Sequence, residues 1–179
     1  MHENYFEDGK WWVSPHNFVP EVRQGLELPP KVQIHDATSR DGEQTPGVVF
    51  SIDDKIRIAK RDQVEVERIE AARPAVSPQD AEAIKEISRL GLNARIHTFA
   101  RALKRDIDMA LECGARGVTI EVPIGYPKIS KQFGWTWEDV FKKSRDVINS
   151  ARDNGLHAVF FPMTRHARGR AISRTCARA

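Results

Sequence analysis

Cysteine is scarce in this sequence, and it has neither a long apolar run nor a leader-like N-terminus. Cys113 and Cys176 are its two cysteines, and neither lies in a C-x-x-C pattern, so no disulfide framework or zinc knuckle is indicated. No apolar run approaches the roughly 20 residues that cross a bilayer. The opening stretch MHENYFEDGKWW lacks a basic start and an apolar core, so no secretory signal is predicted. These absences predict a cytoplasmic protein without a membrane segment.

The basic excess is confined to the C-terminal end of the chain. The formal net charge is +3, but residues 164–179 hold five arginines and no acid, which leaves 23 basic and 25 acidic residues in 1–163. A polybasic tail can bind phosphate backbones, yet no aromatic platform or recognition motif accompanies this one. The sequence therefore does not favour nucleic-acid binding, and residues 164–179 are predicted to be a disordered tail.

Short apolar runs alternate with longer amphipathic ones after an N-terminal extension, residues 1–31. Helix starts are marked by Ser51 with Asp54, by Ser77 before a proline, and by Thr136 with Asp139. Five strands are predicted between and beside four helices, at residues 32–36, 66–72, 93–100, 117–124 and 156–162. Because strands and helices follow each other in constant order, the chain is predicted to be an α/β protein with a parallel sheet.

A dense polar cluster follows the first predicted strand, where Arg40, Asp41, Glu43 and Gln44 surround Gly42. In parallel α/β proteins, ligands and catalytic residues gather at the carboxyl ends of the strands. A carboxylate suits Mg²⁺, Mn²⁺ or Zn²⁺, and a neighbouring guanidinium can stabilise charge developing on a substrate oxygen. Taken from the residues alone, an arginine–aspartate pair in a loop is more often a surface ion pair, and both interpretations stay open.

The stretches HDATSRDGEQTPGVVFSIDDKIRIAK and RIEAARPAVSPQDAEAIKEI resemble the pyruvate carboxyltransferase or HMGL-like family. This family of metal-dependent acyl-CoA condensing and cleaving enzymes includes 2-isopropylmalate, homocitrate and citramalate synthases and 3-hydroxy-3-methylglutaryl-CoA lyase. Its signature D-x-T-L-R-D-G-E-Q is matched at seven positions, with Ser39 in place of the leucine: Asp36, Thr38, Arg40, Asp41, Gly42, Glu43 and Gln44. The resemblance covers about residues 11–162 and is closest to the synthases.

The resemblance implies a role for each matched residue. Asp41 is the expected metal ligand, and Arg40 the catalytic cation that stabilises an enolate or alkoxide. Gln44, Glu70 and Arg101 are the expected substrate-binding residues. The implied reaction is a Claisen-type condensation of acetyl-CoA with a 2-oxo acid, followed by hydrolysis of the thioester. Members of the family are commonly dimers, which leaves a homodimer open for this chain.

The chain departs from the family in two ways. A (β/α)₈ TIM barrel typically needs ~250 residues, whereas five strands are readable here, and the family's H-x-H metal pair is missing from the sequence. We therefore interpret residues 32–163 as a partial TIM-barrel catalytic domain of a truncated member, expected to be inactive in isolation. The alternatives are an HMG-CoA lyase-like carbon–carbon lyase, or a noncatalytic fragment whose tail binds anions.

Three further residues have simpler interpretations. Asp36, at the end of the first strand, is predicted to order the following loop by hydrogen bonding. His35 precedes it in an alternating strand, so its side chain is predicted to face the other side of the sheet. His97, within the third predicted strand, is interpreted as a core or pocket histidine whose ring is satisfied by hydrogen bonds, rather than a metal ligand.

Overall fold

The computed structural model describes residues 6–7, 11–27 and 29–163. The chain divides into two compact units, Met1–Val32 and Gln33–Ala179. In the first unit, β1 (Phe6–Glu7) pairs antiparallel with β2 (Trp11–Trp12), and two single-turn helices follow, η1 (Pro15–Phe18) and α1 (Pro20–Arg23). The predicted tail, 164–179, lies outside the described residues.

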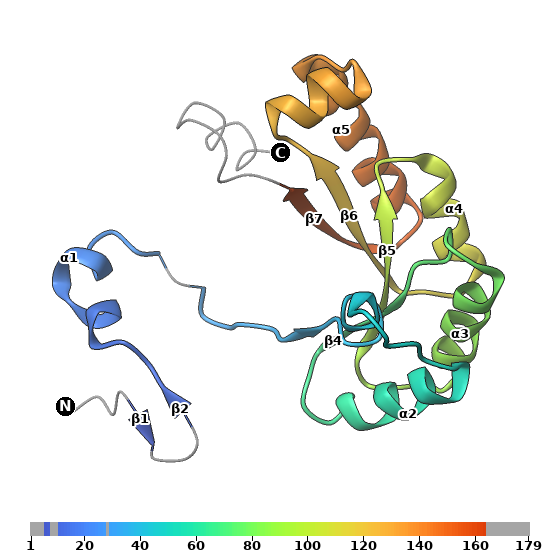
Figure 1. Cartoon of the computed structure of the whole chain (residues 1–179), viewed down its shortest axis with the longest axis horizontal. Helices are drawn as coiled ribbons and strands as arrows, with labels where there is room; N and C mark the ends of the chain where they lie inside the picture. Colours follow the sequence, from blue (N-terminus) through green and yellow to red (C-terminus); the bar gives the residue numbers. More distant parts are fainter. Residues whose placement is uncertain (1–5, 8–10, 28, 164–179) are drawn as a thin grey trace. The chain divides into compact units, whose positions relative to one another are not determined.

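The second unit is built on five parallel strands that hydrogen-bond in sequence order. They are β3 (His35–Asp36), β4 (Arg68–Ala72), β5 (Arg95–Arg101), β6 (Gly117–Pro123) and β7 (His157–Met163). The sheet curls, and Figure 1 shows α3, α4 and α5 along its outer face. This curled half-barrel confirms the predicted partial TIM barrel.

Four helices connect these strands: α2 (Ile52–Asp62), α3 (Pro78–Arg89), α4 (Lys104–Glu112) and α5 (Trp137–Asp153). Reciprocal capping boxes start two of them, as predicted. The Ser51 hydroxyl accepts from the Asp54 amide at 3.1 Å and the Asp54 carboxylate from the Ser51 amide at 3.0 Å, and Thr136 and Asp139 repeat the pattern. Such caps satisfy helix N–H groups that would otherwise lack partners.

The hydrophobic core lies between the outer face of the sheet and these helices. Ile69 on β4 and Ile120 on β6 are fully buried against helix residues such as Ile84 and Ile107. Each such side chain contributes about 1.5–3 kcal/mol when it leaves water. The opposite, inner face of the sheet carries buried polar groups instead, so the chemistry of the unit is concentrated there.

Two local features differ from the sequence prediction. The first strand is shorter than predicted: it begins at His35, and Val32 and Ile34, which precede it, are 70% and 54% exposed. A π-helical turn, η3 (Pro127–Phe133), also follows β6 and ends at Gly134, whose φ of 63° favours glycine. In the part of the chain that the structure describes, no helix has the length and apolar character to cross a membrane.

Candidate active site

The loop after β3 is shaped by a carboxylate at the end of that strand. Asp36 accepts hydrogen bonds from the amide of Thr38 at 2.9 Å and from its hydroxyl at 2.8 Å. The amides of Arg40 and Asp41 then donate to the carbonyl of Ala37, at 3.1 and 2.7 Å. These bonds fold the chain back over the strand end and confirm the predicted role of Asp36. Arg40 is thereby directed towards the inner face of the sheet.

A buried carboxylate receives the Arg40 side chain there. Arg40 Nε donates to Glu70 Oε1, and His35 Nε2 lies 3.1 Å from Glu70 Oε2. The Glu70 side chain is only 2% exposed, whereas that of Arg40 is 18% exposed. The guanidinium also lies 4.4 Å from the centroid of the Phe99 ring, a cation–π arrangement. Glu70 on β4 and Phe99 on β5 therefore hold the Arg40 cation at the carboxyl end of the sheet.

Glu70 is ionised in this arrangement. Burial by itself raises the pKa of the carboxyl, but the hydrogen bond from His35 and the charge of Arg40 outweigh burial, so the pKa of Glu70 is lowered. An ionised carboxylate only accepts hydrogen bonds. Both of its oxygens are therefore available to the two basic neighbours at neutral pH.

Asp41 stands at the rim of the cluster. Its Oδ1 accepts from Arg40 NH1 at 2.7 Å, and its side chain is 63% exposed. Within the described residues no three histidines, cysteines, aspartates or glutamates lie together as metal ligands. Structural and catalytic sites for ions such as Zn²⁺ use three or more protein ligands, and the described residues do not supply such a set. Asp41 supplies one carboxylate, and no more.

A buried lysine, which sequence reasoning missed, holds the second half of the loop. Lys55 on α2 is 3% exposed, and its Nζ lies 2.7 Å from both Glu43 Oε2 and Asp80 Oδ1. Burial lowers the pKa of Lys55, but the hydrogen bonds that its ammonium donates to Asp80 and Glu43 more than offset burial, and the pKa is raised. The sequence does contain a signal for this site. Lys55 lies on the apolar side of α2, beside Ile52, Ile56 and Ala59, and a charge buried there needs oppositely charged partners.

Two of the predicted substrate-binding residues lie outside the Arg40–Glu70 contacts. Gln44 is exposed and has no side-chain hydrogen bond to the described residues. Arg101 binds Asp106 with Nε at 2.9 Å and NH2 at 2.8 Å, and its amide donates to the same carboxylate at 3.0 Å. Asp106 is 1% exposed. This pairing fixes the start of α4, which is a structural role.

A row of histidines continues from the cluster across the inner face. The ring of His97 on β5 lies 5.3 Å from that of His35 and 5.2 Å from that of His157 on β7. His97 is fully buried, and burial, followed by the charge of His35, lowers its pKa to about 3. It is a neutral core histidine, as predicted, but the prediction that its ring would be satisfied by hydrogen bonds is wrong for the described residues. Neither ring nitrogen has a hydrogen-bond partner among the described residues.

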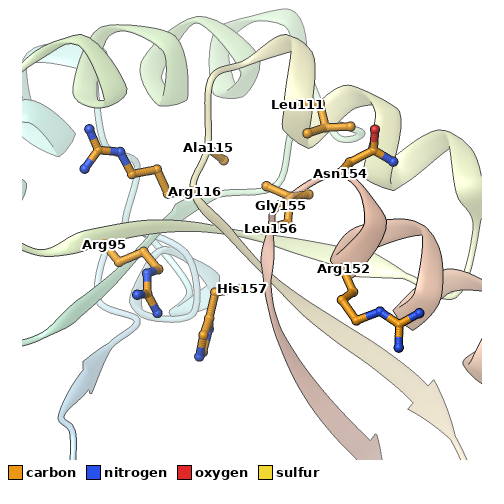
Figure 2. Close-up of a pocket in the computed structure, with 9 residues that line it drawn as sticks. All are labelled: Arg95, Leu111, Ala115, Arg116, Arg152, Asn154, Gly155, Leu156 and His157. Atoms are coloured by element: carbon orange, nitrogen blue, oxygen red, sulfur yellow. The ribbon is translucent and has the colours of Figure 1, made fainter.

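A cavity of about 490 Å³ lies at the other end of the sheet (Figure 2). It is formed where β5 and β7 begin and where α4 and α5 end, and it is lined by Arg95, Arg116, Arg152, His157, Leu111 and Leu156 among others. Helix C-termini carry partial negative charge, which arginines there complement. Ligands of parallel sheets bind at the opposite, carboxyl ends, and the cavity contains none of the predicted site residues.

The fold and the cluster define a class: parallel α/β half-barrels that hold an arginine, backed by a buried carboxylate, at the carboxyl ends of their first strands. Comparison with known proteins narrows this class. The HMGL-like family model matches residues 31–173. The chain belongs to the HMGL-like family, as the signature motif predicted.

Named relatives lie on the synthase side. Homocitrate synthase AksA of Methanopyrus kandleri is 37% identical over 144 residues, which are 80% of this chain and 36% of the relative. A candidate (R)-citramalate synthase of the same organism is 39% identical over 76% of this chain and 27% of the relative. Homocitrate synthase 1 of Nostoc is 39% identical over 70% of this chain and 34% of its own length.

The solved structures that resemble the chain support the fold. HMG-CoA lyase of Bacillus subtilis superimposes with a TM-score of 0.61 at 21% identity, over 75% of this chain and 47% of the lyase. At that identity the likeness concerns the fold alone. The chain spans about a third of the length of the curated relatives named above.

Proposed function

We propose that this chain forms the first half of an active site that condenses acetyl-CoA with a 2-oxo acid. The observation that carries the proposal is the Arg40 guanidinium, held at the carboxyl end of the sheet by the buried carboxylate of Glu70. The homocitrate synthases among the relatives support this choice of chemistry over others that the fold can host.

Arg40 has one edge left for a ligand. Nε is used by Glu70 and NH1 by Asp41, while NH2 makes no hydrogen bond to the described residues. In the condensation, the methyl proton of acetyl-CoA passes to a base, the ketone oxygen of the 2-oxo acid becomes an alkoxide and takes up a proton, and water then hydrolyses the thioester to a carboxylate and the free thiol of coenzyme A. A fixed cation beside that oxygen stabilises the charge as it forms.

The other predicted site residues keep proposed roles that their contacts allow. The side-chain amide of Gln44, which makes no hydrogen bond to the described residues, is proposed to contact the substrate. Asp106 does not bind NH1 of Arg101, and this nitrogen is proposed to bind a substrate carboxylate. Asp41 is proposed as one ligand of a divalent ion, Mg²⁺, Mn²⁺ or Zn²⁺. Because the described residues do not complete that site, no step of the reaction is assigned to the metal.

A chimera tests the proposal. Residues 33–163 would replace the matching segment of the Methanopyrus homocitrate synthase, which supplies the remaining strands. Thiol release from acetyl-CoA is measured with several 2-oxo acids, 2-oxoglutarate and pyruvate among them, and the product is identified by mass. We expect thiol release that requires a 2-oxo acid. A folded chimera that releases no thiol contradicts the proposal, and acetyl-CoA formed from 3-hydroxy-3-methylglutaryl-CoA would assign the chain to the lyase alternative instead.

A further inference from the structure

The two oxygens of Glu70 are bound by different residues on different elements. Oε1 accepts from Arg40, in the loop after β3, and Oε2 lies 3.1 Å from His35 Nε2, within β3 itself. A carboxylate bound at one oxygen can still swing about its last side-chain bond. Binding at both oxygens fixes its plane, and the direction in which it receives the guanidinium follows from that plane.

His35 reaches Glu70 because of its place in the strand. Successive side chains of a strand point to opposite faces. Asp36 accordingly points to the outer side, where it lies near Asp62 of α2. The pKa of Asp62 is raised, first by burial and then by the neighbouring charge of Asp36. His35 points to the inner side and meets Glu70. This confirms the opposite orientations predicted for His35 and Asp36.

The imidazole of His35 is itself held in place. Its ring packs against His97 at 77° between the ring planes, an edge-to-face contact. His97 in turn lies over Gly117 of β6, where the Cβ of any other residue would overlap the imidazole. A glycine on one strand thus makes room for His97, and His97 packs against the histidine that binds Glu70.

We propose that His35 is a positioning residue that orients Arg40 through Glu70, and this rests on the function proposed above for Arg40. His35 does not touch the reacting atoms. Its Nε2–H donates a hydrogen bond to Glu70 Oε2, because an ionised carboxylate has only lone pairs to offer. The imidazole therefore carries its proton on Nε2, and the fixed carboxylate leaves the NH2 edge of Arg40 directed at the ligand.

The first test follows the Arg40 side chain in the whole chain by nitrogen-15 NMR. Hydrogen exchange of the Arg40 Nε–H is compared in wild type, His35→Phe and His35→Gln. Phenylalanine keeps a ring against His97 but cannot donate, whereas the glutamine amide can. We expect His35→Phe to speed the exchange by about tenfold, the effect of losing a charge-assisted hydrogen bond, and His35→Gln to restore most of the protection. Equal exchange in wild type and His35→Phe overturns the proposal.

Two further measurements separate positioning from general loosening. His157→Gln removes the other histidine that touches His97 but has no contact with Glu70, so Arg40 exchange should be unchanged in it. The tautomer of His35, read from its ring nitrogen shifts in the wild type, must be the Nε2–H form, and the Nδ1–H form refutes the proposal even if His35→Phe fails to fold. Neither readout depends on catalysis, so an inactive chimera would refute the proposed function and leave this inference to be decided separately.

Discussion

Acidification should destabilise the chain through His97. Burial holds the pKa of this histidine at about 3 in the folded chain, against 6.5 for the ordinary residue. Between these two pH values His97 is protonated in the unfolded chain and neutral in the folded chain. The free energy of unfolding therefore falls as the pH drops through that window. No contribution is lost above about pH 6.5, because His97 is then neutral in both states. The lowered pKa of His157 acts in the same direction.

The magnitude follows from the two pKa values. Each pH unit in the window is worth about 1.4 kcal/mol, so His97 should remove about 2 kcal/mol of unfolding free energy between about pH 7.5 and pH 5.0. Glu70, whose pKa is lowered, contributes stability above its unfolded value of 4.5 and loses it only below that pH. It therefore changes little over the same interval.

The assay is urea unfolding of wild type and His97→Phe at both pH values. The stability of the variant should fall less between them, by about the 2 kcal/mol assigned to His97. Phenylalanine is chosen because it keeps a flat ring over Gly117. As a check on the folded state alone, the His97 ring signals should stay constant from neutral pH down to about pH 4. A His97 that titrates near 6.5 in the folded chain refutes the reasoning.

Three other perturbations have expected outcomes. Lys55→Met leaves Glu43 and Asp80 without their shared cation and should lower the unfolding free energy in urea by about 3 kcal/mol. The control Lys85→Met, at a 39% exposed position, should change it by less than about 0.5 kcal/mol. Similar losses in the two variants would contradict the structural role of Lys55. Gly117→Ala should cost about 1–3 kcal/mol by crowding His97, and adding His97→Ala should remove most of the crowding, so strictly additive losses would count against the contact. Titration of the isolated chain with Mn²⁺ should show weak binding and no condensation activity; tight binding that Asp41→Ala abolishes would reveal a metal site that the described residues do not show.

Much of the fold was predictable because its signals are local. Ser51 with Asp54 and Thr136 with Asp139 place two helix starts by short-range hydrogen bonds that the sequence states directly. The first strand was overextended because Val32 and Ile34 have the composition of a buried strand, while burial depends on a neighbouring strand that a local pattern does not contain. The π-helical turn at 127–133 carries no distinct composition signal.

The candidate site also contains residues that a local sequence motif predicts and residue pairs that it does not. The motif predicts the position of Arg40 and Asp41 in the loop after the first strand, because all of its residues lie within nine consecutive positions. The bond from His35 to Glu70 spans 35 residues, and that from Lys55 to Asp80 spans 25. Such pairs depend on strand register and helix packing, which no single stretch of sequence specifies. Arg101 was predicted to bind substrate from the family resemblance alone. In the structure its Nε and NH2 donate to Asp106, which lies only five residues away.

The most direct test of the central claim is the rate of thiol release by the chimera carrying Arg40→Lys, compared with the chimera carrying Arg89→Lys. Lysine keeps the charge at residue 40 but cannot bind Glu70 through Nε while presenting a second edge to the ligand. Arg89 is 68% exposed on α3 and serves as the matched control. The account predicts that Arg40→Lys lowers kcat by about 100-fold or more while Arg89→Lys leaves it unchanged. Equal rates in the two chimeras would contradict it.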